Sequence, residues 1–93
     1  MSDAEGFYVK LKSSLDNTTE FPAEYLYKFI VPAEGKKVEQ IEYLFKDKFA
    51  RITTKKSKTG KYISISIKVE LASSDEVISY YKQAGSIEGI ISL

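Results

Sequence analysis

Residues 61–71 read Lys-Tyr-Ile-Ser-Ile-Ser-Ile-Lys-Val-Glu-Leu. Every odd position from Ile63 to Leu71 is aliphatic, and every even position from Ser64 to Glu70 is polar or charged. Because successive side chains of a β-strand point to opposite faces, this alternation predicts a strand with one apolar and one polar face. We therefore expect a sheet that is packed on one face, and on the other is open or covered by groups that tolerate polar side chains.

The composition limits both the fold and the chemistry. The chain has 93 residues, of which 43% are hydrophobic and 29% charged, as expected for one globular domain with a single core. It contains no cysteine and no histidine, which excludes a disulfide framework, a thiolate zinc site and the commonest general base. Its apolar runs are too short to span a membrane, and its first six residues do not resemble a secretory signal. We expect a cytoplasmic protein.

Charge is unevenly distributed along the chain. The net charge is only +1, but residues 46–68 contain eight basic residues and one acid, which gives this segment a charge of +7. The segments before and after it each carry −3. The middle of the chain therefore forms a local basic patch in a nearly neutral protein.

The first half of the chain predicts two strands around a helix. Residues 23–31 are rich in aromatic and β-branched residues and predict a strand; Tyr25, Tyr27, Phe29 and Val31 share one face, and Leu26, Lys28 and Ile30 share the other. In residues 36–49 the period changes, and this predicts an amphipathic helix. Its apolar side consists of Val38, Ile41, Leu44, Phe45 and Phe49. Residues 50–56 predict a short strand.

The second half predicts a hairpin, a helix and a final strand. Residues 57–60, Ser-Lys-Thr-Gly, predict a turn in which Gly60 supplies a positive φ. Residues 73–76, Ser-Ser-Asp-Glu, predict a helix start with a serine cap and acids in the first turn. Gly85 is expected to end that helix, and its buried side is expected to consist of Val77, Ile78, Tyr81 and Ala84. Residues 86–93 predict the last strand.

An additional helix is predicted near the N-terminus. Phe7, Leu11 and Leu15 recur at every fourth position, and Asp3 is a suitable cap. The alternation of Phe7, Val9 and Leu11 leaves a strand open as an alternative. We assign this helical extension and its linker to residues 1–19, and the domain proper to residues 20–93.

The predicted order of elements after residue 19 is β-α-β-β-α-β. Right-handed crossovers place both helices on one face of a four-stranded antiparallel sheet, with the strands at 23–31 and 61–71 side by side in the middle. This is the ferredoxin-like α+β arrangement. The second face of the sheet then carries Leu26, Lys28, Ile30, Tyr62, Ser64, Ser66, Lys68 and Glu70.

This second face is too polar for a core, whereas Leu26 and Ile30 make it more apolar than an ordinary solvated surface. Three arrangements are open at this point. The N-terminal helix lies on the face, or the face makes a dimer contact, or the face is mostly solvated and the helix docks at an edge of the sheet.

Three groups of residues carry a resemblance to a known family. They are Glu20-Phe21-Pro22 with Tyr27-Lys28-Phe29, residues 57–62 with Ser64 and Ser66, and Tyr81 through Gly85 followed by Ile87-Glu88. In their order and spacing, residues 20–93 resemble the YbeD-like family of small bacterial proteins. The resemblance implies a domain similar to the ACT regulatory domains of amino-acid metabolism, with a suggested link to lipoate metabolism and no established enzymatic activity. The chain departs from the family pattern in its longer N-terminal extension and in residues 89–92, where relatives tend to have a basic residue.

The residues offer little support for catalysis. The chain has no nucleophile elbow, phosphate loop or dinucleotide fingerprint, and its carboxylates lack metal-binding spacing. Lys28 is the one unusual residue, because an ammonium buried inside a central strand loses its proton more readily and can act as a nucleophile or base. The simpler interpretation is an exposed Lys28 on the second face, near Glu70 or a serine. We therefore predict that the protein is not an enzyme.

Lysines cluster at the predicted hairpin, which raises the question of nucleic-acid binding. RNA-recognition domains share this topology and stack bases on aromatic residues of the central strands. Here Tyr62 is the one aromatic residue on the second face of the strand after the hairpin, and Ser64 follows it, so the stacking platform is missing. The lysines are suited to holding phosphates without sequence preference, but lysines that keep an edge strand from pairing are the more common case.

We predict a non-catalytic binding or regulatory module that, as the resemblance implies, senses a small effector or contacts a metabolic enzyme. The predicted binding surface consists of Lys28, Tyr62, Ser64, Ser66 and Lys68, and it continues to a basic patch of Lys55, Lys56, Lys58 and Lys61. The expected partner is a protein or a second copy of the chain, with a small-molecule effector as a further option. Nucleic-acid binding through the hairpin is the alternative function, and neither a cofactor nor a membrane is expected.

Overall fold

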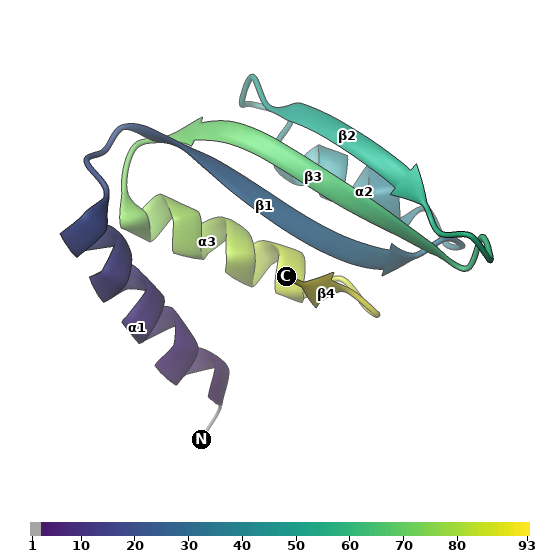
Figure 1. The fold of residues 1–93 in the computed structure, drawn as a ribbon, viewed down its shortest axis with the longest axis horizontal. Helices are drawn as coiled ribbons and strands as arrows, with labels where there is room; N and C mark the ends of the chain where they lie inside the picture. Colours follow the sequence, from purple (N-terminus) through teal and green to yellow (C-terminus); the bar gives the residue numbers. More distant parts are fainter. Residues whose placement is uncertain (1–2) are drawn as a thin grey trace.

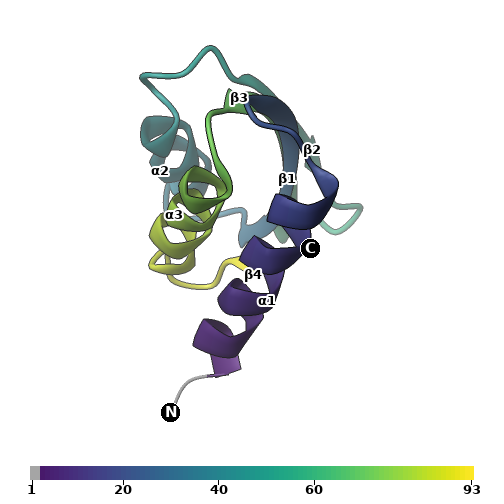
Figure 2. The same cartoon turned by 90° about the vertical axis from the view of Figure 1, so that its left-hand side faces the viewer.

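The computed structural model describes residues 3–93. Its elements follow in the order α1 (Asp3–Thr18), β1 (Ala23–Pro32), α2 (Lys37–Leu44), β2 (Arg51–Lys56), β3 (Tyr62–Leu71), α3 (Ser74–Gly85) and β4 (Ile91–Ser92) (Figure 1). The strands form one antiparallel sheet in the order β2-β3-β1-β4. Helices α2 and α3 lie on the same side of this sheet (Figure 2). The ferredoxin-like α+β arrangement predicted from the sequence is therefore confirmed.

The core lies between the sheet and these two helices. Strands β1 and β3 pair along their whole length, from Ala23 opposite Leu71 to Pro32 opposite Tyr62. The alternation predicted for both strands is confirmed, because their apolar face is buried, as shown by Tyr27, Phe29, Val31, Ile65, Ile67, Val69 and Leu71. Burial of this apolar surface is the main source of the stability of the sheet.

Helix α3 begins as the sequence predicts. Ser73 is the N-cap, and its Oγ accepts a 3.2 Å hydrogen bond from the backbone N–H of Glu76. The carboxylate of Glu76 in turn accepts a 2.7 Å bond from the N–H of Ala72. The helix ends at Gly85, as predicted, but the following residue, Ser86, keeps a right-handed conformation with φ −79°, so a left-handed glycine does not end it.

Helix α2 is shorter than predicted. It ends at Leu44 rather than continuing to residue 49, and Phe49, which was expected on its apolar side, is fully exposed. Phe45 leaves helical geometry with φ −105° and ψ 16°, while its ring enters the core and stacks on Tyr80 at a centroid distance of 4.4 Å. Packing of this one side chain therefore takes precedence over the helical period, and residues 45–49 form turns.

The last strand is also shorter than predicted. Only Ile91 and Ser92 pair with β1, whereas the prediction covered residues 86–93. Ile87 continues the buried side of α3, and a turn at Gly89, where φ is +82°, separates it from β4. A Cβ atom at this position would lie 2.9 Å from Cγ of Pro32, so the turn passes too close to β1 for a side chain.

The N-terminal segment is a helix, so the alternative strand interpretation is wrong. Leu15 is buried and Leu11 is partly buried against the core, but Phe7, the third residue of the predicted stripe, is 56% exposed. Tyr8 packs against the core in its place. The predicted cap by Asp3 depends on a side chain that lies outside the described part of the structure.

Helix α1 docks beside α3, on the side of the sheet formed by β1 and β4 (Figures 1 and 2). Nζ of Lys12 lies 3.0 Å from a carboxylate oxygen of Asp75 and 3.1 Å from Oγ of Ser74, which donates a 2.6 Å bond to Asp16. These groups form a polar clasp between the two helices. Of the three arrangements left open by the sequence, the helix thus docks at an edge of the sheet and does not lie on the second face, where Leu26 remains 48% exposed.

Candidate functional site

The side of the sheet opposite α2 and α3 is the open face. Pairing of the strands arranges its side chains in three neighbouring rows across the sheet. The rows are Lys55–Ser64–Ile30, Thr53–Ser66–Lys28 and Arg51–Lys68–Leu26. Ile91 of β4 extends the first row on the far side of β1. The alternation in β1 and β3 predicted which residues of these two strands lie on the open face. Arg51, Thr53 and Lys55 of β2 join them because of the pairing between β2 and β3.

Four cations of the open face, Lys28, Arg51, Lys55 and Lys68, come from three adjacent strands. The ion pairs found among residues 3–93 do not involve them, since those pairs use Lys12, Lys48 and Lys82. The acidic residues of this face, Glu24 and Glu70, stand opposite each other at the end farthest from the hairpin. The row of Glu24 and Glu70 adjoins the row of Arg51 and Lys68, so Lys28 and Lys55 are the cations of the face that lie farther from its carboxylates.

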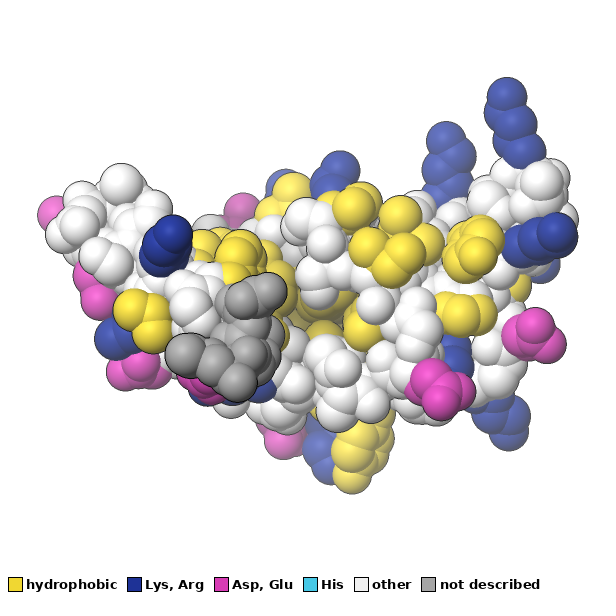
Figure 3. Space-filling view, turned by 90° about the horizontal axis from the view of Figure 1, so that it is seen from below, with side chains coloured by type: hydrophobic (Ala, Val, Ile, Leu, Met, Phe, Trp, Pro, Cys, Tyr) yellow, Lys and Arg dark blue, Asp and Glu magenta, His cyan; other side chains and the backbone are white. Residues whose placement is uncertain are grey.

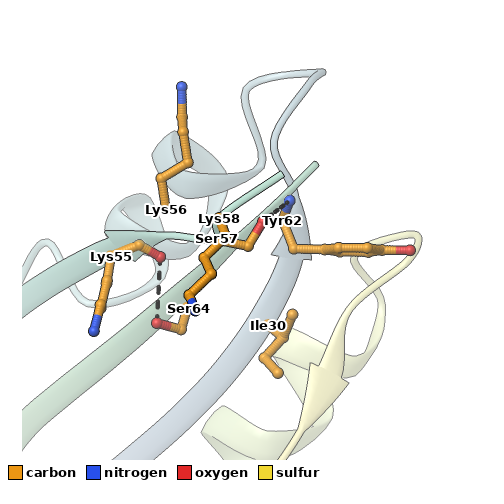
Figure 4. A pocket seen from close by; sticks show the side chains of 7 residues that line it. All are labelled: Ile30, Lys55, Lys56, Ser57, Lys58, Tyr62 and Ser64. Atoms are coloured by element: carbon orange, nitrogen blue, oxygen red, sulfur yellow. Dashed lines mark hydrogen bonds between the residues drawn. The ribbon is translucent and has the colours of Figure 1, made fainter. Parts of the chain in front are cut away.

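One hollow of the open face lies at the β2–β3 hairpin and has a volume of about 300 Å³. We call it the hairpin pocket (Figure 4). Ile30, Tyr62 and Ser64 line it from the sheet, and Lys55, Lys56, Ser57 and Lys58 line it from the hairpin. In Figure 4 the side chains of Lys55 and Lys58 extend on the Ser64 side of the hairpin, whereas Lys56 points the opposite way.

Hydrogen bonds hold the walls of the hairpin pocket in place. The Oγ atom of Ser57 accepts a 3.1 Å bond from the N–H of Tyr62, and the N–H of Ser57 donates a 2.8 Å bond to the carbonyl oxygen of Tyr62. The hydroxyl of Ser64 donates a 3.3 Å bond to the carbonyl oxygen of Lys55. Gly60 takes the predicted positive φ, 75°, and donates a 2.9 Å bond to the carbonyl oxygen of Ser57. The turn is thus a defined hairpin rather than a loose loop.

A second hollow of about 180 Å³ lies farther along the open face. It is lined by Leu26, Arg51, Thr53, Ser66 and Lys68. Lys28 lines neither hollow, although Thr53 and Ser66, which share its row, line the second one. The open face is therefore a surface with two shallow depressions, and Lys28 lies outside both.

Comparison with known proteins places the chain in a family. Residues 16–93 match the family described as "Protein of unknown function (DUF493)". The chain belongs to this family. It is 27% identical over 84 residues to a UPF0250 protein of Shewanella halifaxensis (strain HAW-EB4), in a match that covers 86% of this chain and 94% of that protein. These findings confirm the resemblance to the YbeD-like family.

A solved structure supports the fold of this family member. The solution structure of protein HP0495 from H. pylori is similar with a TM-score of 0.65, and the match covers 82% of this chain and 86% of that chain. Sequence identity between the two is 18%, so the likeness establishes the shared fold.

The structure divides the basic patch predicted for this family member. Lys55, Lys56 and Lys58 line the hairpin pocket together with Tyr62 and Ser64 of the predicted binding surface. Lys61 does not line this pocket but an adjoining hollow of about 400 Å³, which also includes Glu34 and shares Tyr62 with the hairpin pocket. Ser66 and Lys68 belong to the second hollow of the open face. The alternation in the sequence predicted that Tyr62, Ser64, Ser66 and Lys68 share one face. It did not predict which of the three hollows each residue lines.

Lys28 has the simpler of its two predicted environments. Its side chain is exposed on the open face, directly opposite Ser66 on β3. The burial that would make this lysine a nucleophile or base is therefore not found. Glu70, the other neighbour considered from the sequence, is opposite Glu24 at the end of the strand pair.

A groove that the sequence analysis missed lies on the helical side of the molecule. It has a volume of about 470 Å³ and is lined by Lys36, Gln40 and Tyr43 beside α2 and by Gln83 and Ile87 at the end of α3, among others. Gln40 and Tyr43, on the exposed side of α2, could have indicated this groove. The sequence analysis did not consider that side, because it predicted a helix that extends to residue 49.

Two observations on the described chain concern other classes of site. Among residues 3–93, the acidic side chains do not gather in threes in the way that a carboxylate metal site requires. None of the helices in this range has the length and apolar character needed to cross a bilayer.

Proposed function

We propose that this protein is a non-catalytic binding module that holds an acidic surface of a protein partner against its open face. The observation that carries the proposal is the set of cations Lys28, Arg51, Lys55 and Lys68 on three adjacent strands, which are outside the ion pairs formed within residues 3–93. Complementary charge steers association and selects partners, and it disfavours contact with other basic surfaces.

Apolar side chains among these cations support a contact that excludes water. Leu26 is 48% exposed and Ile30 is half-buried, and both stand in rows that contain a cation. A partner that covers these residues gains hydrophobic stabilisation, while its carboxylates meet the lysines and Arg51 around them. On a sheet face that contacts only water, exposed apolar side chains among the cations would contribute no such stabilisation.

A regulatory role fits this surface. The similarity of the family to ACT domains favours a partner that is a metabolic enzyme. The chain has neither histidine nor cysteine, and exposure of Lys28 removes the one lysine-based route to catalysis considered from the sequence. We therefore place the activity with the partner rather than with this protein.

The test compares capture of proteins from a lysate of the source organism by wild type, by Lys28→Ala/Ser66→Leu and by a control. The control, Lys37→Ala, removes a lysine from α2 on the opposite side of the sheet. We expect a discrete partner to be captured by wild type and control and lost with the open-face variant. The captured protein is then purified, and its affinity is measured by calorimetry at two salt concentrations, where higher salt weakens the complex. Equal affinity for wild type and the open-face variant would contradict the proposal.

Nucleic acid is the alternative partner, and one observation favours it. Lys55, Lys58 and the aromatic ring of Tyr62 line the same pocket, as phosphate contacts and a stacking surface do in proteins that bind single strands. In the same capture experiment, recovered nucleic acid that is lost with Lys55→Ala/Lys56→Ala/Lys58→Ala and after nuclease treatment would replace the protein partner. Binding of this kind weakens steeply with salt, because each neutralised phosphate releases counterions.

A further inference from the structure

The hairpin pocket combines an apolar floor with a cationic rim. The ring of Tyr62 and the side chain of Ile30 provide apolar surface, and Tyr62 is 48% exposed. The stems of Lys55 and Lys58 add methylene groups to the walls. An apolar group placed on this floor leaves water for a surface that is already partly dehydrated, which favours binding.

The charges at the rim select the ligand. Carboxylates are absent from the residues that line the pocket, and the ammonium groups of Lys55 and Lys58 are outside the ion pairs formed within residues 3–93. Both side chains extend on the side of the hairpin that carries Ser64 (Figure 4). An anionic group at the rim therefore gains two charge-assisted contacts without displacing an existing ion pair.

The wider surface agrees with this assignment. Lys and Arg side chains project from the hairpin end of the molecule in Figure 3, next to hydrophobic side chains. Acidic side chains in that view lie mostly at the opposite end and along the lower margin, but acidic atoms also stand beside the basic side chains at the hairpin end. Residues 46–68 carry a charge of +7, so basic groups outnumber acidic ones where a small anion approaches the pocket.

The volume of the hairpin pocket limits the size of a ligand that it can hold. Pockets for small molecules have volumes of roughly 300–1,000 Å³, so the hairpin pocket, at about 300 Å³, is at the lower limit. This volume accommodates one ring system or a short chain. The hydrogen bonds between Ser57 and Tyr62 keep the pocket open before a ligand arrives, which lowers the entropic cost of binding.

We propose that the hairpin pocket binds a small amphiphilic anion, that is, a free molecule with one apolar ring or short chain and a terminal phosphate or carboxylate. Its apolar part lies on Tyr62 and Ile30, and its anionic group lies between Lys55 and Lys58. This small ligand is distinct from the protein partner of the proposed function, and the inference rests on that function only in sharing the open face. Because binding is measured on the isolated protein, its failure is separate from failure of the partner complex.

The test is a titration of the ¹⁵N-labelled protein with 1-naphthyl phosphate, followed by amide chemical shifts. We expect saturable shifts concentrated at residues 57–64 and at Ile30. Inorganic phosphate and 1-naphthylmethanol, added separately, test the anion and the ring alone, and each is expected to bind at least about tenfold more weakly because it lacks one of the two contacts. 1-Naphthoate distinguishes a preference for phosphate from a preference for carboxylate, and tighter binding of either anion supports the proposal.

Single substitutions test which residues of the hairpin form the binding site. Lys58→Ala is expected to raise Kd about two- to fivefold, as for removal of one exposed charge, and Tyr62→Ala about two- to tenfold. Lys61→Ala is the matched control, since this lysine is in the same hairpin, is exposed and faces another hollow. An unchanged Kd is expected for Lys61→Ala.

Three results would overturn the proposal. The first is an equal loss of affinity in Lys61→Ala and Lys58→Ala, which would mean that only the net charge of the hairpin matters. The second is equal binding of inorganic phosphate and naphthyl phosphate. The third is tighter binding of a thymidine octanucleotide that displaces naphthyl phosphate and depends on the same residues, which would assign the pocket to single-stranded nucleic acid.

Discussion

The hydroxyl of Tyr27, in the middle of β1, donates a 2.9 Å hydrogen bond to the carbonyl oxygen of Val77 in the first turns of α3. Tyr27 is completely buried, and its ring contacts those of Phe45 and Tyr81. Burial raises the pKa of Tyr27 well above its ordinary value, because the phenolate would have to leave water. The bond therefore links the central strand β1 to the helix α3 that covers it, and both partners lie inside the core.

Removal of this hydroxyl is expected to destabilise the fold. Tyr27→Phe keeps the ring and loses the bond to Val77, so the free energy of unfolding falls by about 1 kcal/mol. Urea denaturation followed by circular dichroism measures the change, and the slope of the transition should stay constant. Tyr62→Phe, which removes an exposed hydroxyl from the open face, is the control. Equal stability of Tyr27→Phe and wild type would show that the bond contributes nothing.

The ion pair of Lys48 and Glu76 predicts a pH-dependent contribution to stability. Nζ of Lys48 lies 2.8 Å from the carboxylate of Glu76, and this contact, together with the N–H of Ala72, lowers the pKa of Glu76 below its ordinary value of 4.5. A carboxyl with a lowered pKa in the folded state stabilises the fold above its unfolded pKa. That stabilisation is lost as the pH falls through the folded value.

Glu76→Gln tests this contribution, because glutamine still accepts the bond from Ala72 but carries no charge. We expect the variant to be less stable than wild type by about 0.5–1 kcal/mol at pH 7, and the difference to shrink towards pH 3. Urea titrations at several pH values measure it. Glu88→Gln, at an exposed residue outside the ion pairs found in residues 3–93, should show no such trend. A pH-independent difference for Glu76→Gln would refute the ion-pair explanation.

The polar clasp predicts how firmly α1 is held. The buried hydroxyl of Ser74 and the ammonium of Lys12 lower the pKa of Asp16, with the Ser74 bond as the larger cause. In Ser74→Ala both contacts of the hydroxyl are lost, and amide protons of α1 should exchange faster while those of β1 and β3 keep their protection. Hydrogen exchange followed by NMR measures this at each residue. Ser79→Ala, on the exposed side of α3, is the control. Uniform loss of protection would mean that the clasp stabilises the whole domain rather than α1.

Two glycines are expected to respond in opposite directions to the same substitution. Gly89→Ala places a Cβ atom 2.9 Å from Cγ of Pro32 at a φ of +82°, so we expect a loss of at least about 1 kcal/mol. Gly6→Ala adds a methyl group within α1, where nothing lies within 4 Å, and is expected to stabilise the helix by about 0.5–1 kcal/mol. Thermal unfolding of both variants measures the two signs. A stable Gly89→Ala would show that the turn before β4 relaxes freely.

Much of the candidate site follows from local patterns. The alternation in residues 23–31 and 61–71 placed Lys28, Tyr62, Ser64, Ser66 and Lys68 on one face, and the structure has them there. The register between β2 and β3 then added Arg51 and Lys55, because strand pairing joins residues that are far apart in sequence. Lys61 does not line the hairpin pocket, which agrees with the period of two in this segment, because odd and even positions point to opposite faces.

The sequence by itself determined the order of the elements, the apolar face of the two central strands and the serine cap of α3, since each depends on residues within one turn or one strand. The tertiary structure alone decided where α2 ends, how short β4 is and where α1 docks. In each case a distant contact outweighs the local preference: Phe45 stacks on Tyr80, the turn at Gly89 passes close to Pro32, and Lys12 reaches Ser74 and Asp75. Long-range packing has this effect because a marginal helical turn or strand end is worth less free energy than one well-packed buried side chain.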